Sequence, residues 1–341
     1  MQHFISDNAS PAHPEVIAAI VEANKNHEAA YGHDRVTAKA MDDLKKHFGE
    51  DCQVFFVSTG TAANLIALKS VLESHQAVIC ADSAHLYKDE CGAPEAILGA
   101  KLLPVTTEQG KISPQAIAPL LLDTNMVHRI QPKVVSISQC TEWGTVYTLD
   151  ELKALSRFCR EHRLLLHVDG ARLANAACRL QTSLKEICLN GDVDLLSFGG
   201  TKNGLMGAEA VIIFNPKLAA RTPFIQKQFM QLSSKMRYLS AQFSALFHDN
   251  LWQRNASHAN QMSTLLAELV QDDVDIVMPV ETNVVFARLP FAAIVPLQQS
   301  FPFAVWQSRH HIVRWMTSYD TREETVHAFA KKIKEVLREY Q

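Results

Sequence analysis

The sequence predicts an α/β protein in which a large domain built on a mainly parallel sheet precedes a small α+β domain. Short apolar runs alternate with longer helical patterns over roughly the first 250 residues. Several runs are apolar nearly throughout, which is typical of strands that helices cover on both faces. A chain of 341 residues has room for one large and one smaller domain.

Six runs are expected to form strands of the large sheet: Gln53–Val57, Ala77–Ala81, Lys133–Ser138, Leu164–Val168, Asp194–Phe198 and Glu209–Phe214. Two of the helical patterns between them are Thr61–Leu72 and Leu149–His162. The second carries one apolar stripe, formed by Leu152, Leu155, Phe158 and Cys159, as expected of a helix packed on a sheet.

The pattern changes near residue 250, where a second unit begins. Its expected elements are a helix at Leu251–Val270, a strand at Asn283–Leu289, a helix at Phe291–Ser300, a strand at Ile312–Ser318 and a helix at Arg322–Tyr340. We therefore divide the chain into an N-terminal segment (1–14), a large domain (15–250) and a small C-terminal domain (251–341).

Composition argues against several classes of protein. The net charge of −3 and the lack of Lys/Arg blocks give no sign of a nucleic acid or membrane partner. No apolar run approaches the roughly 20 residues that span a bilayer, and no secretory leader is visible. The seven cysteines show no C-x-x-C spacing, so reduced thiols in the cytoplasm are expected and no metal site is predicted.

The first chemical signal is the turn Ser58–Asn64, which follows an expected strand and opens an expected helix. Free N–H groups and the positive end of a helix can bind phosphate, and Gly60 would let the backbone approach it closely. The hydroxyls of Thr59 and Thr61 would add donors. Ordinary helix capping by these residues is the structural alternative.

The second and third signals follow two later strands. Asp169 ends the strand in His167–Arg172, where its partner could be Arg172 or the protonated pyridine nitrogen of pyridoxal 5′-phosphate (PLP). Lys202 lies among small residues in Gly199–Gly204, where an amine could form a Schiff base. A phosphate turn, an acid after a later strand and a lysine after the next strand therefore occur in that order.

With these motifs the chain resembles the threonine aldolase and aromatic amino acid β-eliminating lyase family of fold-type I PLP-dependent enzymes. The resemblance covers nearly the whole chain. The stretches that carry it are Ser6-Asp7, Tyr31-Gly32, Ser58–Asn64, Ala84–Gly92, His167–Arg172, Gly199–Gly204 and Val313–Asp320.

The resemblance implies a role for each matched residue. Lys202 would form the Schiff base, Asp169 would bind the pyridine nitrogen, His85 would stack on the ring, and Thr59, Gly60 and Thr61 would hold the phosphate. Arg172 and Arg314, helped by Ser6, would bind the substrate carboxylate, and Arg172 would also lie beside the cofactor. Arg237 would reach the cofactor phosphate of a neighbouring subunit, and Tyr31, in a segment that crosses between subunits, would help to bind the substrate. Both imply a homodimer or homotetramer with shared active sites.

The expected reaction is cleavage of L-threonine or L-allo-threonine, with low specificity, to glycine and acetaldehyde. His85 and His128 are the candidate general bases. Three segments depart from the family pattern and border the expected substrate pocket: Asn8–Ser10, Gln139–Gly144 and Gly199–Thr201. The alternatives are β-elimination from another amino acid, a protein that binds PLP without turnover, and a nucleotide-dependent oxidoreductase, which the missing glycine fingerprint disfavours.

Overall fold

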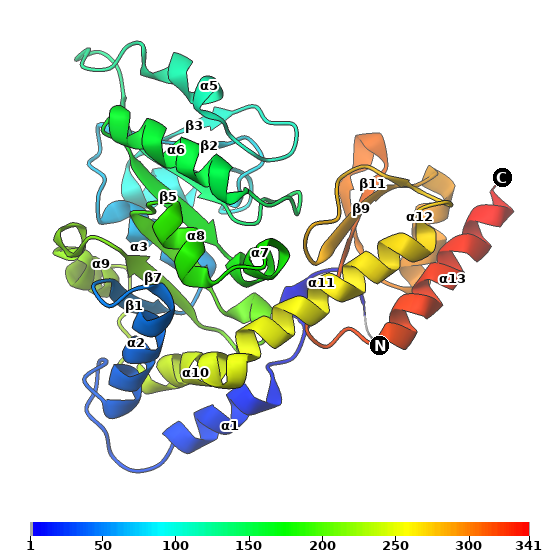
Figure 1. Ribbon diagram of the computed structural model, residues 1–341, viewed down its shortest axis with the longest axis horizontal. Helices are drawn as coiled ribbons and strands as arrows, with labels where there is room; N and C mark the ends of the chain where they lie inside the picture. The colour runs from blue at the N-terminus through cyan, green and yellow to red at the C-terminus, as the bar shows by residue number, and fades with distance from the viewer. Residues whose placement is uncertain (1–2, 341) are drawn as a thin grey trace.

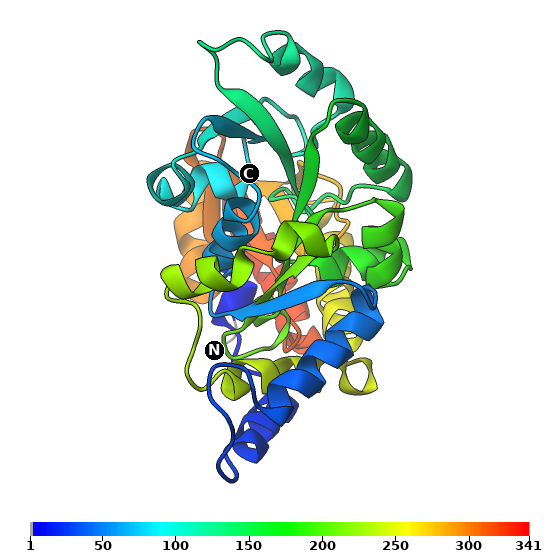
Figure 2. The ribbon, with the colours of Figure 1, turned by 90° about the vertical axis from the view of Figure 1, so that its left-hand side faces the viewer.

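A seven-stranded sheet in the order β1-β7-β6-β5-β4-β2-β3 forms the centre of the large domain in the computed structural model, which describes residues 3–340. Its strands are β1 (Gln53–Val57), β2 (Gln76–Ala81), β3 (Lys101–Val105), β4 (Gln131–Ser138), β5 (Leu165–Gly170), β6 (Leu195–Gly199) and β7 (Glu209–Ile213). Figure 2 shows the twist of this sheet through the molecule.

Strand β7 is the exception to a parallel sheet, because it pairs antiparallel with both β1 and β6. The other neighbours, from β6 through β5, β4 and β2 to β3, are parallel. The connection between β6 and β7 spans only residues 200–208, which is too short for a parallel crossover. The expected mainly parallel α/β sheet is confirmed.

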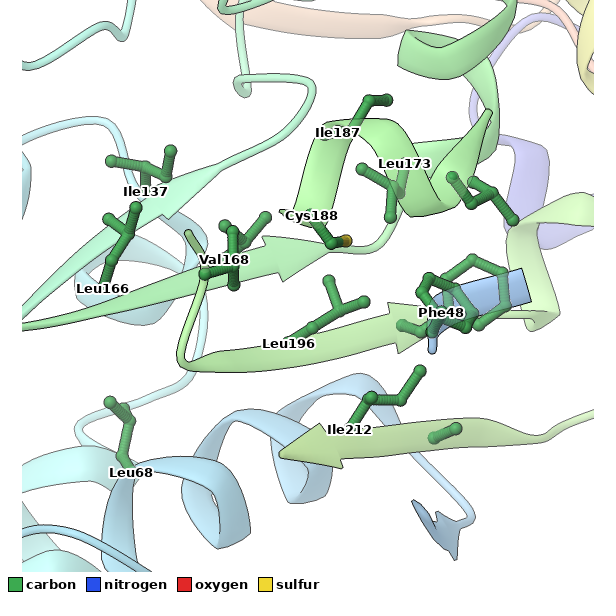
Figure 3. Packing of buried hydrophobic residues seen from close by; sticks show 14 of the residues in the cluster. Phe48, Leu68, Ile137, Leu166, Val168, Leu173, Ile187, Cys188, Leu196 and Ile212 are labelled. Carbon is green, nitrogen blue, oxygen red and sulfur yellow. The ribbon is translucent and has the colours of Figure 1, made fainter. Parts of the chain in front are cut away.

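Helices cover both faces of this sheet. The helices of the large domain are α1 (Pro14–Ala23), α2 (Arg35–Phe48), α3 (Gly60–Lys69), α4 (His85–Lys88), α5 (Pro114–Ile117), α6 (Leu149–Glu161), α7 (Leu173–Leu180), α8 (Leu184–Asn190), α9 (Thr222–Gln228) and α10 (Arg237–Phe247). Among them, α1 packs on α10. Strand residues alternate between the faces. Leu195 packs against α3 and α9 on one face. Leu196 faces the other side, where it lies in a cluster with Phe48 of α2 and Ile187 of α8 (Figure 3).

The small domain has an antiparallel sheet in the order β10-β11-β9-β8. Its elements are α11 (Leu251–Val270), β8 (Asp275–Ile276), β9 (Val284–Arg288), α12 (Phe291–Ser300), β10 (Ala304–Gln307), β11 (Ile312–Met316) and α13 (Glu323–Glu339). Helix α11 runs from the large domain to the small one (Figure 1). Trp252 packs in the large core and Leu266 in the small core, so this helix couples the two units.

The N-terminal segment joins the small domain before the chain enters the large one. Phe4 is buried, stacks on Phe329 with ring centroids 4.5 Å apart, and bridges to Phe303. Its carbonyl accepts a hydrogen bond from the Met316 N–H. This attachment places the following residues, Ser6 to Asn8, between the two domains. None of the helices in residues 3–340 is both long and apolar enough to cross a membrane.

Candidate active site

A cavity of about 270 Å³ lies at one edge of the large sheet, where three strands end. Strands β1, β5 and β6 run in the same direction, so their carboxyl ends meet there, at the usual ligand edge of an open α/β sheet. The residues that sequence reasoning had singled out and that line this cavity are Thr59, Gly60, Thr61, His85, Asp169 and Lys202. Lys202 stands in a short 3₁₀ helix, Thr201–Asn203, directly after β6.

The turn before α3 forms one end of the cavity. Thr59 is the N-cap of α3, and its hydroxyl accepts a hydrogen bond from the Ala62 N–H at 3.2 Å. A Cβ added at Gly60 would meet no atom within 4 Å, so the space beside this backbone is open. Because the first N–H groups of a helix have no partner within it, this end of the cavity suits an anion such as phosphate.

Asp169 supplies a fixed negative charge at the end of β5. Its Oδ2 accepts a hydrogen bond from Asn64 Nδ2 at 2.9 Å, and its Oδ1 accepts one from the Ala171 N–H at 3.0 Å. Burial alone would raise the pKa of Asp169, but the Lys202 ammonium and these hydrogen bonds hold it below its ordinary value. The carboxylate is therefore ionised and suited to a cationic partner.

His85 is tied to Asp169 through two residues. Its Nδ1 lies 3.0 Å from Oε1 of the buried Glu90, and Asn64 Nδ2 donates to the same oxygen at 2.9 Å. The Glu90 bond raises the pKa of His85 against the opposing effect of burial. The network His85–Glu90–Asn64–Asp169 thus fixes the ring that faces the cavity.

A second cavity, of about 310 Å³, adjoins the first and shares His85 and Lys202 with it. Ser6, Arg172 and Arg314 line it, so the three residues expected to bind the substrate carboxylate also come together. Arg314 Nη2 donates to the Ile5 carbonyl at 3.0 Å. Burial and the nearby Arg172 lower the pKa of Arg314. An anionic ligand would relieve that unfavourable environment.

Arg172 does not pair with Asp169, which was one of the two partners considered for that acid. Its Nε and Nη2 instead donate to the carboxylate of the buried Asp7 at 2.6 and 2.8 Å. Asn283 Nδ2 donates to the same carboxylate at 3.1 Å. The ion pair and the Asn283 bond therefore connect the N-terminal segment, the large domain and the residue just before β9.

His128 is not brought to either cavity. It is exposed in the loop before β4, whereas the active-site edge lies after the other end of that strand. Eight residues of β4 separate the two ends, a length of about 26 Å at the usual rise per residue. The α5–β4 region lies at the end of the molecule opposite α1 and α2 (Figures 1 and 2). Within this chain His128 therefore lies away from both cavities, and its expected role as a base stays a prediction.

Tyr31 and Arg237 also lie outside both cavities, and they lie near one another. The Tyr31 N–H donates to the Ser234 carbonyl at 2.9 Å, and Arg237 Nη1 donates to the Asn26 carbonyl at 3.2 Å. Both residues therefore lie where the loop between α1 and α2 meets the segment before α10. Tyr31 is exposed, which leaves its ring free for a contact beyond this chain.

Comparison with known proteins agrees with this geometry. The family model described as beta-eliminating lyase matches residues 3–291, most of the chain. The chain belongs to the beta-eliminating lyase family. The family resemblance that the motifs indicated is therefore confirmed.

Relatives of this lyase family member are named for one activity. A low specificity L-threonine aldolase from a Pseudomonas species is 44% identical over 98% of both chains. One from Pseudomonas aeruginosa is 45% identical over 98% of both chains. The solved structure of Leishmania major threonine aldolase is 32% identical, covers 98% of this chain and 99% of its own, and superposes with a TM-score of 0.93.

Sequence reasoning missed several acids and one amide of this lyase site. Asp7, Asn64 and Glu90 lie within the matched stretches. Asp7 and Asn64 make their contacts across 165 and 105 positions, whereas Glu90 bonds to His85 five positions away and to Asn64 across 26. Glu142 and Glu209 are further acids that line the cavities. Glu209 accepts a hydrogen bond from the Gly200 N–H at 2.7 Å and so supports the turn that carries Lys202. A useful signal for Glu142 was its place in Gln139–Gly144, a segment that departs from the family pattern.

Proposed function

We propose that this protein binds PLP through Lys202 and cleaves L-threonine and L-allo-threonine to glycine and acetaldehyde. The observation that carries the proposal is the single cavity onto which Lys202, Asp169, His85 and the Thr59–Thr61 turn all face. The names of the relatives that align over 98% of their length support the choice of reaction.

The residues present fit PLP. The turn before α3 would bind the phosphate, Asp169 would pair with the pyridine nitrogen, Lys202 would supply the amine and His85 would cover a ring face. When bound, PLP supplies a sink for the electron pair that Cα–Cβ cleavage releases. Asp169 strengthens that sink because an ionised carboxylate favours a protonated pyridine nitrogen.

The second cavity would hold the substrate. Arg314 is the better candidate for the main carboxylate contact, because Asp7 already neutralises much of the Arg172 charge. Arg314 Nε is buried and has no hydrogen-bond partner among residues 3–340. A carboxylate that accepted from Arg314 would satisfy it, with Ser6 and Arg172 completing the pocket.

We also propose a homodimer or homotetramer that works in the cytoplasm. Tyr31 lies near α9, since Lys227 is 5.2 Å from its ring, and the exposed Phe224 and Met230 flank the same region. Gln231, next to Met230, accepts hydrogen bonds from Ser58 at the edge of the cofactor cavity. A partner that covered this apolar surface would reach the phosphate end. All seven cysteines are free and five are buried, as suits a reducing compartment.

The absorbance spectrum of the purified protein with PLP tests the cofactor assignment. The wild type should show a Schiff-base absorbance band at about 410–430 nm, and Lys202→Ala should lack this band. Product analysis with L-threonine then tests the reaction. Glycine and acetaldehyde would mark aldol cleavage, whereas a 2-oxo acid and ammonia would mark elimination. A wild-type protein without the band would contradict the proposal.

A further inference from the structure

We propose that Glu142 is a catalytic residue that accepts the proton of the substrate β-hydroxyl group. This inference rests on the proposed function and names a candidate base that lines the substrate cavity of the same chain, which His128 does not. It concerns a segment, Gln139–Gly144, that follows β4 and enters the wall of the substrate cavity.

The position of Glu142 is the first step. It lines the same cavity as Lys202 and Arg314. A β-hydroxy amino acid whose carboxylate meets Arg314 and whose amino group meets the cofactor on Lys202 must therefore lie in the cavity that Glu142 borders. The side chain of that amino acid would contact the other residues that line the cavity, which include Trp306, Val284 and Glu142.

The hydrogen bonds of Glu142 are the second step. Its Oε1 is held on two sides, by Ser138 Oγ at 2.6 Å and by the His85 N–H at 2.8 Å. Its Oε2 is buried and has no hydrogen-bond partner among the residues that the structure describes. A buried carboxylate oxygen without a donor is uncommon and indicates a missing partner. A hydroxyl group in the cavity, or one water between them, would supply that donor.

The other candidate bases are less suitable. His85 is bonded through Nδ1 to Glu90, which favours its protonated form and so makes it a poorer acceptor. Asp89 also lines the cavity, but it is exposed and solvated. Glu90 also has one buried oxygen without a partner, but it lines neither cavity, whereas Glu142 is held by the protein, has one oxygen unpartnered and lines the substrate cavity.

The proposed step balances as follows. The Glu142 carboxylate takes the β-hydroxyl proton, and the electrons of that O–H bond form the carbonyl bond of acetaldehyde. The Cα–Cβ bond breaks and its electron pair stays with Cα, where PLP, when bound, would supply a sink for it. Cα takes up one proton from water to give glycine, and Glu142 returns its proton to solvent, so no further reactant is needed.

Burial raises the pKa of Glu142, and the nearby Asp169 carboxylate acts in the same direction. A base with a raised pKa is better matched to neutral pH than an ordinary carboxylate. The titratable and charged groups that share its surroundings are Cys80, His85, Asp89, Cys140, Tyr147, Asp169, Arg172, Lys202 and Arg314. Because the step needs the ionised carboxylate, kcat/KM should rise with pH as Glu142 loses its proton.

Glu142→Gln is the decisive variant, because the amide oxygen can still accept from Ser138 and His85 but cannot take a proton. We expect kcat for L-threonine to fall about 100-fold or more, as is typical for loss of a general base. The acid limb of the kcat/KM profile should disappear. The PLP band and its response to glycine, which has no hydroxyl, should stay as in the wild type. Glu161→Gln, an exposed site on α6, is the matched control and should behave as the wild type.

A second readout needs neither cofactor nor turnover. The infrared spectrum of the protein without PLP should show a carboxylic acid band that fades as the pH rises and that Glu142→Gln lacks. Wild-type kcat and an unchanged acid limb in Glu142→Gln would overturn the inference. The inference would also be overturned if the PLP band of Glu142→Gln no longer responded to glycine, because Glu142 would then be a positioning residue. If the wild type itself gave no glycine and acetaldehyde, the proposed function would fail first, and this inference with it.

Discussion

At the scale of single residues, Glu90 controls the charge of His85. The Glu90 bond raises the pKa of His85, so Glu90→Gln should lower that pKa. A raised histidine pKa adds stability that is fully present below its unfolded value of about 6.5 and is lost as the pH rises through the folded value. The melting temperatures of wild type and variant should therefore differ most below about pH 6.5. An NMR titration of His85 without PLP measures the shift directly, and equal His85 pKa values in both proteins would refute the role of Glu90.

The Asp7–Arg172 ion pair is the second feature at this scale, and it is deeply buried. The side chains are 1% and 16% exposed, so removing one charge strands the other in the interior. Asp7→Asn should lower the free energy of unfolding by about 3–5 kcal/mol in urea denaturation. The exposed pair Arg254–Glu15 is the matched control, and Glu15→Gln should cost about 0–1 kcal/mol. Equal losses in the two variants would show that burial does not decide the energy.

Sequence reasoning placed the residues that stand in a motif, but it did not find the residues that hold them in position through hydrogen bonds. Thr59 and Lys202 come just after strands and Asp169 lies at the end of one, so the rule about carboxyl ends of parallel strands locates them. Asn64 instead reaches Asp169 across 105 positions, and Asp7 reaches Arg172 across 165. No local pattern encodes such contacts, because they depend on how β1, β5 and the N-terminal segment meet in space.

At the scale of elements, the strand–turn–helix unit at the end of β6 depends on a glycine. A Cβ at Gly199 would lie 2.4 Å from the Ala171 carbonyl oxygen, a backbone atom that cannot easily move. Gly199→Ala should therefore push the β6 end away from β5 and misplace Lys202. We expect weaker PLP binding, measured by titration of the Schiff-base band. Gly191→Ala is the control, since its Cβ would lie 2.8 Å from the Ile187 carbonyl far from the site, where it should lower stability but not PLP affinity.

Apolar strands were predicted well because burial on both faces leaves a strong pattern. β1 was placed with its observed bounds, and α11 and α12 were too. β3 was not predicted, because it is an edge strand that mixes Lys101 and Pro104 with apolar residues. The direction of β7 is not written in its own sequence, since it follows from the short connection after β6.

At the scale of the whole molecule, the site depends on both domains and on the N-terminal segment together. Helix α11 packs in both cores, and Phe4 anchors the segment that carries Ser6 and Asp7 to the small domain. Apart from Asn8 of the N-terminal segment, the residues that line the cofactor cavity belong to the large domain, whereas Arg314 reaches the substrate cavity from β11. A movement of the small domain would therefore change substrate contacts before it changed cofactor contacts.

The last prediction concerns the assembly. If Arg237 serves the site of a neighbouring subunit, then Lys202→Ala and Arg237→Ala damage different parts of one shared site. In a mixed dimer, one of the two sites would contain both substitutions and the other would contain neither. Co-expression of the two inactive variants should then restore about one quarter of wild-type activity, because half of randomly formed dimers are mixed and each has one intact site. Purified single variants, and a co-expressed pair of Lys202→Ala and Asp169→Asn, which damage the same chain's share of the site, are the controls and should stay inactive. Absence of any recovery in the Arg237 pair, with mixed dimers shown by differently tagged chains, would mean that each subunit completes its own site.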